Sequence, residues 1–197
     1  MSDAPTAGRV GHSRYSTVAI WLHWIIAVMI IGNLTGGLTM DYWLDSPDPA
    51  MKQTGLVIIQ IHKSIGLTVL VLSLLRLGWR IAHPAPPLPG HMTRTERVLA
   101  RLTHYGFYAL MLLLPLSGWA MVSTGKQIFP IRYFGLFEMP HLPLDKAFGG
   151  LFKESHELLG WIAIATIVLH VAAAMKHHYF DRDDVLARML PTVRPHQ

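Results

Sequence analysis

Five histidines lie within or at the edges of the long apolar stretches of this sequence. They are His23, His62, His104, His156 and His170. An ionisable side chain inside a membrane-spanning helix is costly, so it marks a functional site by default. The chain contains 12 histidines and no cysteine. Imidazole is therefore the one soft nitrogen ligand that the chain offers in quantity, and imidazole suits haem iron, zinc and copper.

The spacing of two of these histidines indicates two separate sites. His156 and His170 are 14 residues apart in the fourth apolar stretch. In a helix they would lie on nearly the same face, about 21 Å apart along the axis. This distance is too long for one shared metal ion, but it suits two cofactors stacked across one bilayer.

Each of these two histidines has a potential partner at a similar depth in another apolar stretch. His23 matches His170 near one membrane surface, and His62 matches His156 near the other. Two imidazoles fill both axial positions of a haem, which favours electron transfer over oxygen binding. A lone buried histidine can equally bond a neighbouring carbonyl, but four histidines at paired depths favour ligation. The pattern predicts two haem b groups.

Two further residues are candidates for the surroundings of these haems. His104 begins the third apolar stretch, and it competes with His23 as the inner ligand or faces a haem edge or propionate. Arg76 follows His62 by 14 residues, so both lie on one helix face. Its guanidinium is expected either to bind a haem propionate or to reach the lipid headgroups. The loop and terminal histidines are expected only to be solvated; these are His12, His83, His91, His141 and His196.

The elements that must position these histidines are membrane helices. Four apolar stretches, at about 16–40, 55–80, 102–122 and 155–177, each approach the roughly 20 residues that cross a bilayer. The chain is 51% hydrophobic and 15% charged, against about 25% charged residues in soluble domains. The absence of cysteine excludes disulfides, iron–sulfur clusters and c-type haem attachment. We expect an all-α, four-helix integral membrane bundle forming a single domain, 1–197.

The positive charges predict how this bundle is oriented. By the positive-inside rule, both termini lie in the cytoplasm, because eleven Lys and Arg residues fall on that side and six on the other. The net charge of +5 therefore reflects basic cytoplasmic loops, and no nucleic-acid partner is expected. The eleven are Arg9, Arg14, Arg76, Arg80, Arg94, Arg97, Arg101, Lys176, Arg182, Arg188 and Arg194; the six are Lys52, Lys63, Lys126, Arg132, Lys146 and Lys153.

Short motifs around the histidines occur in an order and spacing that resemble a known family, over almost the whole chain. The sequence resembles the bacterial cytochrome b561 family of small, four-helix, diheme, quinone-linked proteins of the inner membrane. The motifs are Leu22-His23-Trp24, His62-Lys63-Ser64-Ile65-Gly66, Leu74-Leu75-Arg76-Leu77, His104-Tyr105-Gly106, Leu114-Pro115-Leu116-Ser117-Gly118, His156-Glu157, His170 and His177-His178-Tyr179-Phe180.

The resemblance implies the same four axial ligands and a membrane quinone as partner. In relatives, superoxide outside the membrane can pass its electron through the haems to ubiquinone. A basic outer loop would attract such an anion, although its side chains can equally meet lipid headgroups; its basic residues are Lys126, Arg132, Lys146 and Lys153, beside Lys63. His177, seven residues beyond His170, is expected to bond a quinone carbonyl.

Three other functions compete with this interpretation. A haem-bearing membrane anchor would exchange electrons between quinone and a separate periplasmic oxidoreductase. A histidine-lined divalent-metal transporter is disfavoured, because the apolar stretches hold almost no carboxylate and the histidine pairs are far apart. The remaining alternative is a structural membrane protein with incidental histidines. In a cytochrome the haem performs the redox chemistry, so no catalytic side chain is expected in the electron step.

Overall fold

The structure, a computed structural model, describes residues 14–126, 129–190 and 192–193. Its four long helices are α1 (Thr17–Leu38), α3 (Pro49–Ala82), α4 (Arg94–Thr124) and α5 (Gly149–Lys176). All four spans are long and apolar enough to cross a membrane. The expected all-α membrane bundle is confirmed. Four residues discussed above lie outside the described ranges: Arg9, His12, Arg194 and His196.

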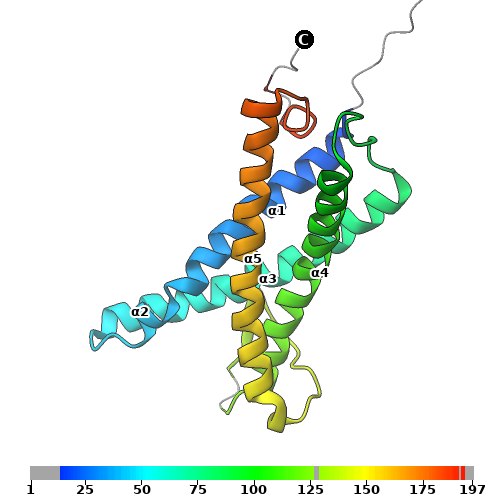
Figure 1. Cartoon of the computed structure of the whole chain (residues 1–197). Helices are drawn as coiled ribbons and strands as arrows, with labels where there is room; N and C mark the ends of the chain where they lie inside the picture. The colour runs from blue at the N-terminus through cyan, green and yellow to red at the C-terminus, as the bar shows by residue number, and fades with distance from the viewer. Residues whose placement is uncertain (1–13, 127–128, 191, 194–197) are drawn as a thin grey trace, which may run out of the picture.

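The four helices form two pairs that cross each other. Helix α1 packs along α3, and α4 packs along α5, while α3 also contacts α4. Figure 1 shows the α1/α3 pair crossing the α4/α5 pair. The start of α1 and the end of α5 lie at the same end of the bundle. From the charge count we call this the cytoplasmic end, and we call the opposite end the outer end.

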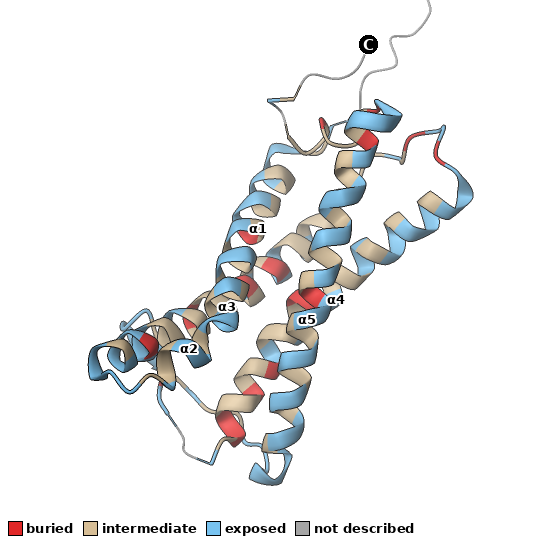
Figure 2. Cartoon of the chain, turned by 60° about the vertical axis from the view of Figure 1, so that its left-hand side comes forward, coloured by how far each residue is buried: buried red, intermediate tan, exposed pale blue. Residues whose placement is uncertain are grey.

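Most of the bundle's apolar surface faces outward. The centre holds a small cluster of buried side chains, Ile26, Val69 and Met111, and Figure 2 shows the exposed outer faces of the helices. Leu169 is 68% exposed and Val28 is 69% exposed. A soluble protein rarely exposes such continuous apolar faces, so these faces are the ones that meet lipid.

Three helices begin earlier than the apolar stretches suggest. Helix α3 begins at Pro49, where the Asp48 carboxylate accepts the Ala50 N–H at 2.9 Å. Helix α4 begins at Arg94, behind a capping box formed by Thr93 and Glu96. Helix α5 begins at Gly149. Cap residues satisfy the free N–H groups of a helix end, which favours the early starts of α3 and α4, whereas the start of α5 has no side-chain cap.

Short elements lie between the long helices and after α5, and two of them form a hairpin beside the outer part of α3. The short elements are α2 (Met40–Leu44), β1 (Ile131–Tyr133), β2 (Phe137–Met139), the 3-10 turn η1 (Lys146–Phe148) and the π-helical turn η2 (His177–Asp181). Strands β1 and β2 form an antiparallel hairpin that pairs Ile131 with Met139. The sequence analysis did not anticipate this hairpin.

Buried Ser64 of α3 fastens the hairpin. Its Oγ accepts the Phe134 N–H at 2.9 Å and lies 2.8 Å from the Gln60 carbonyl, to which it can donate. Tyr133 OH lies 3.0 Å from Thr68 Oγ1. These contacts place the outer loop directly beside the part of α3 that carries His62.

Candidate functional site

His62 and His156 meet at the outer half of the bundle. They come from α3 and α5, and their ring centroids lie 6.1 Å apart with an interplanar angle of 84°. Two imidazoles on opposite sides of one metal, bound through bonds of about 2.0–2.1 Å, place their centroids about 6.3 Å apart. The ring spacing therefore fits one metal ion between the two rings.

Backbone carbonyls orient both rings of this outer pair. His62 Nδ1 lies 3.1 Å from the Asn33 carbonyl oxygen, and His156 Nδ1 lies 3.1 Å from the Leu114 carbonyl oxygen. Ser117 Oγ also lies 3.1 Å from His156 Nδ1. An Nδ1–H that donates to a carbonyl leaves the Nε2 lone pair for a metal, as is usual for metal-ligating histidines.

Two glycines allow neighbouring helices to lie against these rings. A Cβ added at Gly37 of α1 would lie 3.2 Å from His62 Cε1, and one at Gly118 of α4 would lie 2.9 Å from His156 Cε1. Any larger side chain at Gly118 would displace the ring. Sequence reasoning did not assign these glycines, although their depth in the bilayer, level with the histidines, was a usable signal.

The inner half of the bundle brings three histidines together. The centroids of His23 and His170 lie 6.3 Å apart, and those of His104 and His170 lie 6.0 Å apart. Phe107 packs against His170 at a centroid distance of 5.1 Å. Ring spacing alone therefore leaves both His23 and His104 as partners for His170. All five histidines singled out from the sequence fall into these two groups.

The donor set and the ring spacings fit haem, and comparison with known proteins decides the family. The family model for prokaryotic cytochrome b561 matches residues 14–192. The chain belongs to the prokaryotic cytochrome b561 family. It is accordingly a b-type membrane cytochrome of electron transport, a multi-pass protein of the bacterial inner membrane. The family assignment displaces the metal-transporter and structural-protein alternatives.

Named relatives of this cytochrome b561 span nearly its full length. Cytochrome b561 homolog 2 of Escherichia coli (strain K12) is 33% identical over 187 residues, covering 90% of this chain and 91% of the relative. The probable superoxide oxidase CybB of Yersinia pestis is 30% identical over 184 residues, covering 93% and 99%. Cytochrome b562 of Cereibacter sphaeroides is 29% identical over 177 residues, covering 89% and 94%.

A basic pocket of about 430 Å³ opens at the cytoplasmic end of the cytochrome. Its lining includes Arg14, Arg76, Arg80 and Tyr108. Arg76 Nη1 donates to the Ala19 carbonyl at 3.3 Å. Guanidinium groups gathered in this way suit carboxylates or phosphates. Arg76, which was expected near the cytoplasmic surface, is among the residues that line this pocket.

The basic residues at the outer end are less free than the sequence suggested. Arg132 Nε donates to Glu138 Oε1 at 3.1 Å, and Lys153 Nζ lies 3.7 Å from Glu157 Oε1. Lys63 Nζ donates to the Pro130 carbonyl at 3.2 Å. A pocket of about 600 Å³ beside the hairpin is lined in part by Arg132. Arg132 and Lys153 are therefore each paired with a carboxylate, and paired charges attract an anion less strongly than free ones.

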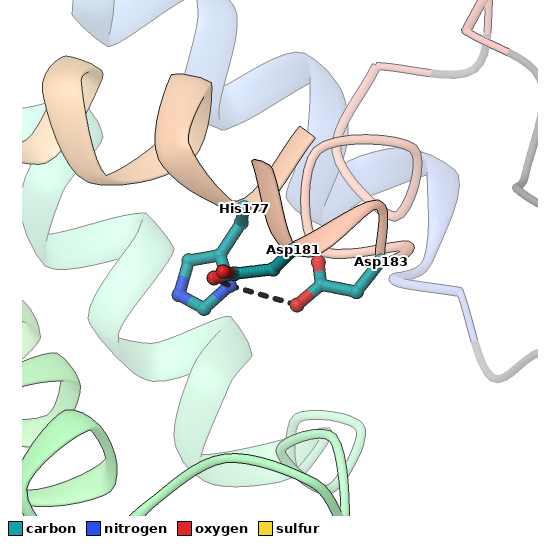
Figure 3. Close-up of side chains that lie close together, drawn as sticks. All are labelled: His177, Asp181 and Asp183. Atoms are coloured by element: carbon teal, nitrogen blue, oxygen red, sulfur yellow. Dashed lines mark hydrogen bonds and ion pairs between the residues drawn. The ribbon is translucent and has the colours of Figure 1, made fainter. Parts of the chain in front are cut away.

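His177, the expected quinone ligand, is buried among carboxylates. Its Nδ1 lies 2.7 Å from Asp183 Oδ2 and 3.1 Å from Asp181 Oδ2. Figure 3 shows that the other ring nitrogen, Nε2, faces away from both carboxylates. Burial raises the pKa of Asp183, but the hydrogen bonds from the Val185 N–H, His177 and His91 outweigh it, so the pKa lies below its usual value.

Two histidines expected only to be solvated make specific contacts. His91 Nε2 lies 3.0 Å from Asp183 Oδ2, and the His83 ring stacks on Trp79 at a centroid distance of 3.9 Å. His141 Nδ1 is a buried atom. His83 and His91 remain exposed, as expected, while making these contacts, and His141 is partly buried.

Proposed function

We propose that this cytochrome holds two haem b groups, one between His62 and His156 and the other between His23 and His170. The observation that supports the proposal is the pair of ring spacings, 6.1 Å and 6.3 Å. In each case one ring comes from α5 and the other from the α1/α3 pair. When bound, the haems supply one-electron redox chemistry, and the chain supplies ligation, ring orientation and an apolar surround.

The arrangement of the four helices as two crossing pairs also supports His23 over His104 as the inner ligand. His104 lies on α4, which packs directly along α5, whereas a planar macrocycle needs room between its two axial ligands. The crossing between the α1/α3 pair and the α4/α5 pair provides that room. His62 and His156, which come one from each pair, face each other across the same crossing. His104 then faces the haem edge, and Arg76 in the basic pocket binds a propionate.

The acceptor in this proposal is a membrane quinone, and ubiquinone is the first to test. Reduction of a quinone to a quinol takes two electrons and two protons. His177 Nε2, turned away from the carboxylates, is the nitrogen proposed to bond a quinone carbonyl and, when both ring nitrogens carry protons, to donate one of them. The second proton can come from water at the cytoplasmic end.

Superoxide is the proposed donor at the outer end. Two superoxide anions give up one electron each and become dioxygen, which balances the reduction of one quinone. A relative named as a probable superoxide oxidase, with 30% identity, supports this choice. Lys126 and Lys146 belong to the outer loop and provide positive charge there.

The first experiment is a haem count on detergent-purified protein by pyridine haemochrome, with reduced-minus-oxidised spectra. Wild type should give two b haems per chain; His62→Ala and His23→Ala should each give one, and His104→Ala should keep two. One haem in wild type would refute the four-ligand assignment. Superoxide-driven reduction of this protein should fall as salt rises. If superoxide reduces neither haem, the donor assignment fails and the membrane-anchor alternative gains support.

A further inference from the structure

A second group of possible metal ligands lies at the cytoplasmic end, separate from the haem histidines. His177 and Asp181 belong to η2, Asp183 follows it, and His91 lies in the loop before α4. Figure 3 shows His177, Asp181 and Asp183 close together, and His91 reaches this group through its contact with Asp183. Donor atoms of His177, Asp181 and Asp183 all lie within 4.8 Å of one another.

The donor spacings are close to those of a tetrahedral site. His177 Nδ1 lies 2.7 Å and 3.1 Å from the two aspartate oxygens, and His91 Nε2 lies 3.0 Å from Asp183 Oδ2. Zinc bonds of about 2.0–2.2 Å in tetrahedral geometry separate neighbouring donors by about 3.3–3.6 Å. The two longer contacts therefore need to open by a few tenths of an ångström, and the contact of 2.7 Å by about 0.6–0.9 Å.

The burial of the group also suits a bound ion. The side chains of Asp183, His177 and Asp181 are 6%, 11% and 25% exposed, whereas that of His91 is 57% exposed. His177 and Asp183 are thus buried and held by surrounding structure, whereas Asp181 and His91 are exposed residues that leave a route of entry. This separates the group from the exposed acidic clusters that are common on protein surfaces.

The local charge calls for a cation. Lys176 Nζ lies 2.9 Å from Glu96 Oε1 and 2.6 Å from Asp181 Oδ2. Asp183 is not paired with this ammonium, so the three carboxylates and Lys176 together sum to a charge of −2. A divalent ion balances that charge. Lys176 can keep its ion pair with Glu96 when the Asp181 carboxylate turns to the ion.

We propose that His91, His177, Asp181 and Asp183 bind one divalent transition-metal ion of the zinc class at the cytoplasmic end. Two nitrogen and two oxygen donors suit zinc, whereas magnesium and calcium take six or more oxygens. The ion joins the loop before α4 to the segment after α5, so its binding stiffens that end of the bundle. The proposal concerns none of the four haem ligands and stands whatever the haem count. It shares His177 with the proposed quinone site: the ion takes Nδ1, which leaves Nε2–H to bond a quinone carbonyl.

The test uses the haem-loaded full chain, stripped with a chelator, dialysed and titrated with Zn²⁺ against a chromophoric competitor. One zinc per chain is expected by elemental analysis, with iron as the internal reference. Asp183→Asn removes a ligand, and even an outer-shell partner is worth 10–100-fold in metal affinity, so we expect a loss of at least about 100-fold. His91→Ala should also weaken binding.

Two variants make the outcome decisive. Lys176→Gln removes the competing ammonium and should tighten zinc binding roughly twofold to fivefold; it tests the idea even if Asp183→Asn folds poorly. His83→Ala removes a cytoplasmic histidine outside the group and should leave the affinity unchanged. Absence of stoichiometric zinc in wild type, or equal affinities for Asp183→Asn, His83→Ala and wild type, overturns the proposal. So does weaker binding by Lys176→Gln.

Discussion

Replacing Gly118 by alanine tests whether the backbone of α4 sets the position of the His156 ring. The new Cβ would lie 2.9 Å from His156 Cε1 and 3.2 Å from its Nδ1. Ordinary carbon contacts begin at about 3.4–3.5 Å, so the ring must withdraw by about half an ångström. That movement also takes Nδ1 away from the Leu114 carbonyl, which it now contacts at 3.1 Å.

Gly106 of the same helix provides the matched control, because a Cβ there meets nothing within 4 Å. Both changes gain about 1 kcal/mol of helix propensity. Only Gly118→Ala adds overpacking, which costs about 1–3 kcal/mol and acts on a proposed ligand. Gly118→Ala should therefore lose the outer haem or shift its spectrum, while Gly106→Ala keeps the wild-type haem content and spectrum.

The assay is a pyridine haemochrome ratio with low-temperature difference spectra on both variants, purified side by side. Gly37→Ala, whose Cβ would lie 3.2 Å from His62 Cε1, should give a smaller effect of the same kind. If Gly118→Ala binds haem with the wild-type ratio and spectrum, His156 is not held against α4 as described. The ligand assignment would then have to be reconsidered.

Three further predictions concern the other elements. Alanine at His23 should abolish the inner haem signal, whereas alanine at His104 should shift its spectrum without loss; the reverse result would exchange their roles. Ser64→Ala leaves the Phe134 N–H without its 2.9 Å acceptor, which should destabilise the hairpin by about 1–3 kcal/mol, seen as faster amide exchange in the hairpin; unchanged exchange would contradict this. Because the folded-state pKa of Asp183 is lowered, its stabilising contribution is present above the usual carboxyl pKa and is lost as pH falls through the lowered value. Thermal unfolding of wild type and Asp183→Asn should therefore differ at neutral pH and converge in acid; a gap that persists in acid would contradict this.

The four membrane helices and the grouping of the histidines were predictable from sequence, for one shared reason. Residue number along a membrane helix reports depth at 1.5 Å per residue, and the bilayer fixes where each helix starts. His62 and His156 could thus be matched without knowledge of the fold. Depth does not report which helices are neighbours, so the competition between His23 and His104 could not be settled in this way.

The features that sequence reasoning missed depend on contacts between segments far apart in the chain. The hairpin is held by Ser64, about 70 residues away from it, and three residues cannot specify a strand on their own. His91 contacts Asp183 across 92 positions, so neither residue signals the other locally. The early start of α3 was the exception, because Asp48 followed by Pro49 is a recognisable cap.

Helix α5 supplies one histidine to each proposed haem, and this restricts how the two cofactors can be adjusted. A rotation or sliding of α5 moves His156 and His170 together, so substitutions in this helix should alter both reduction potentials in concert. The partners of these two residues lie on different helices, α1 and α3. Changes around His23 or His62 can therefore alter the reduction potential of one haem and leave that of the other unchanged. The α1/α3 pair is thus the part of the molecule where the difference between the two potentials can be set.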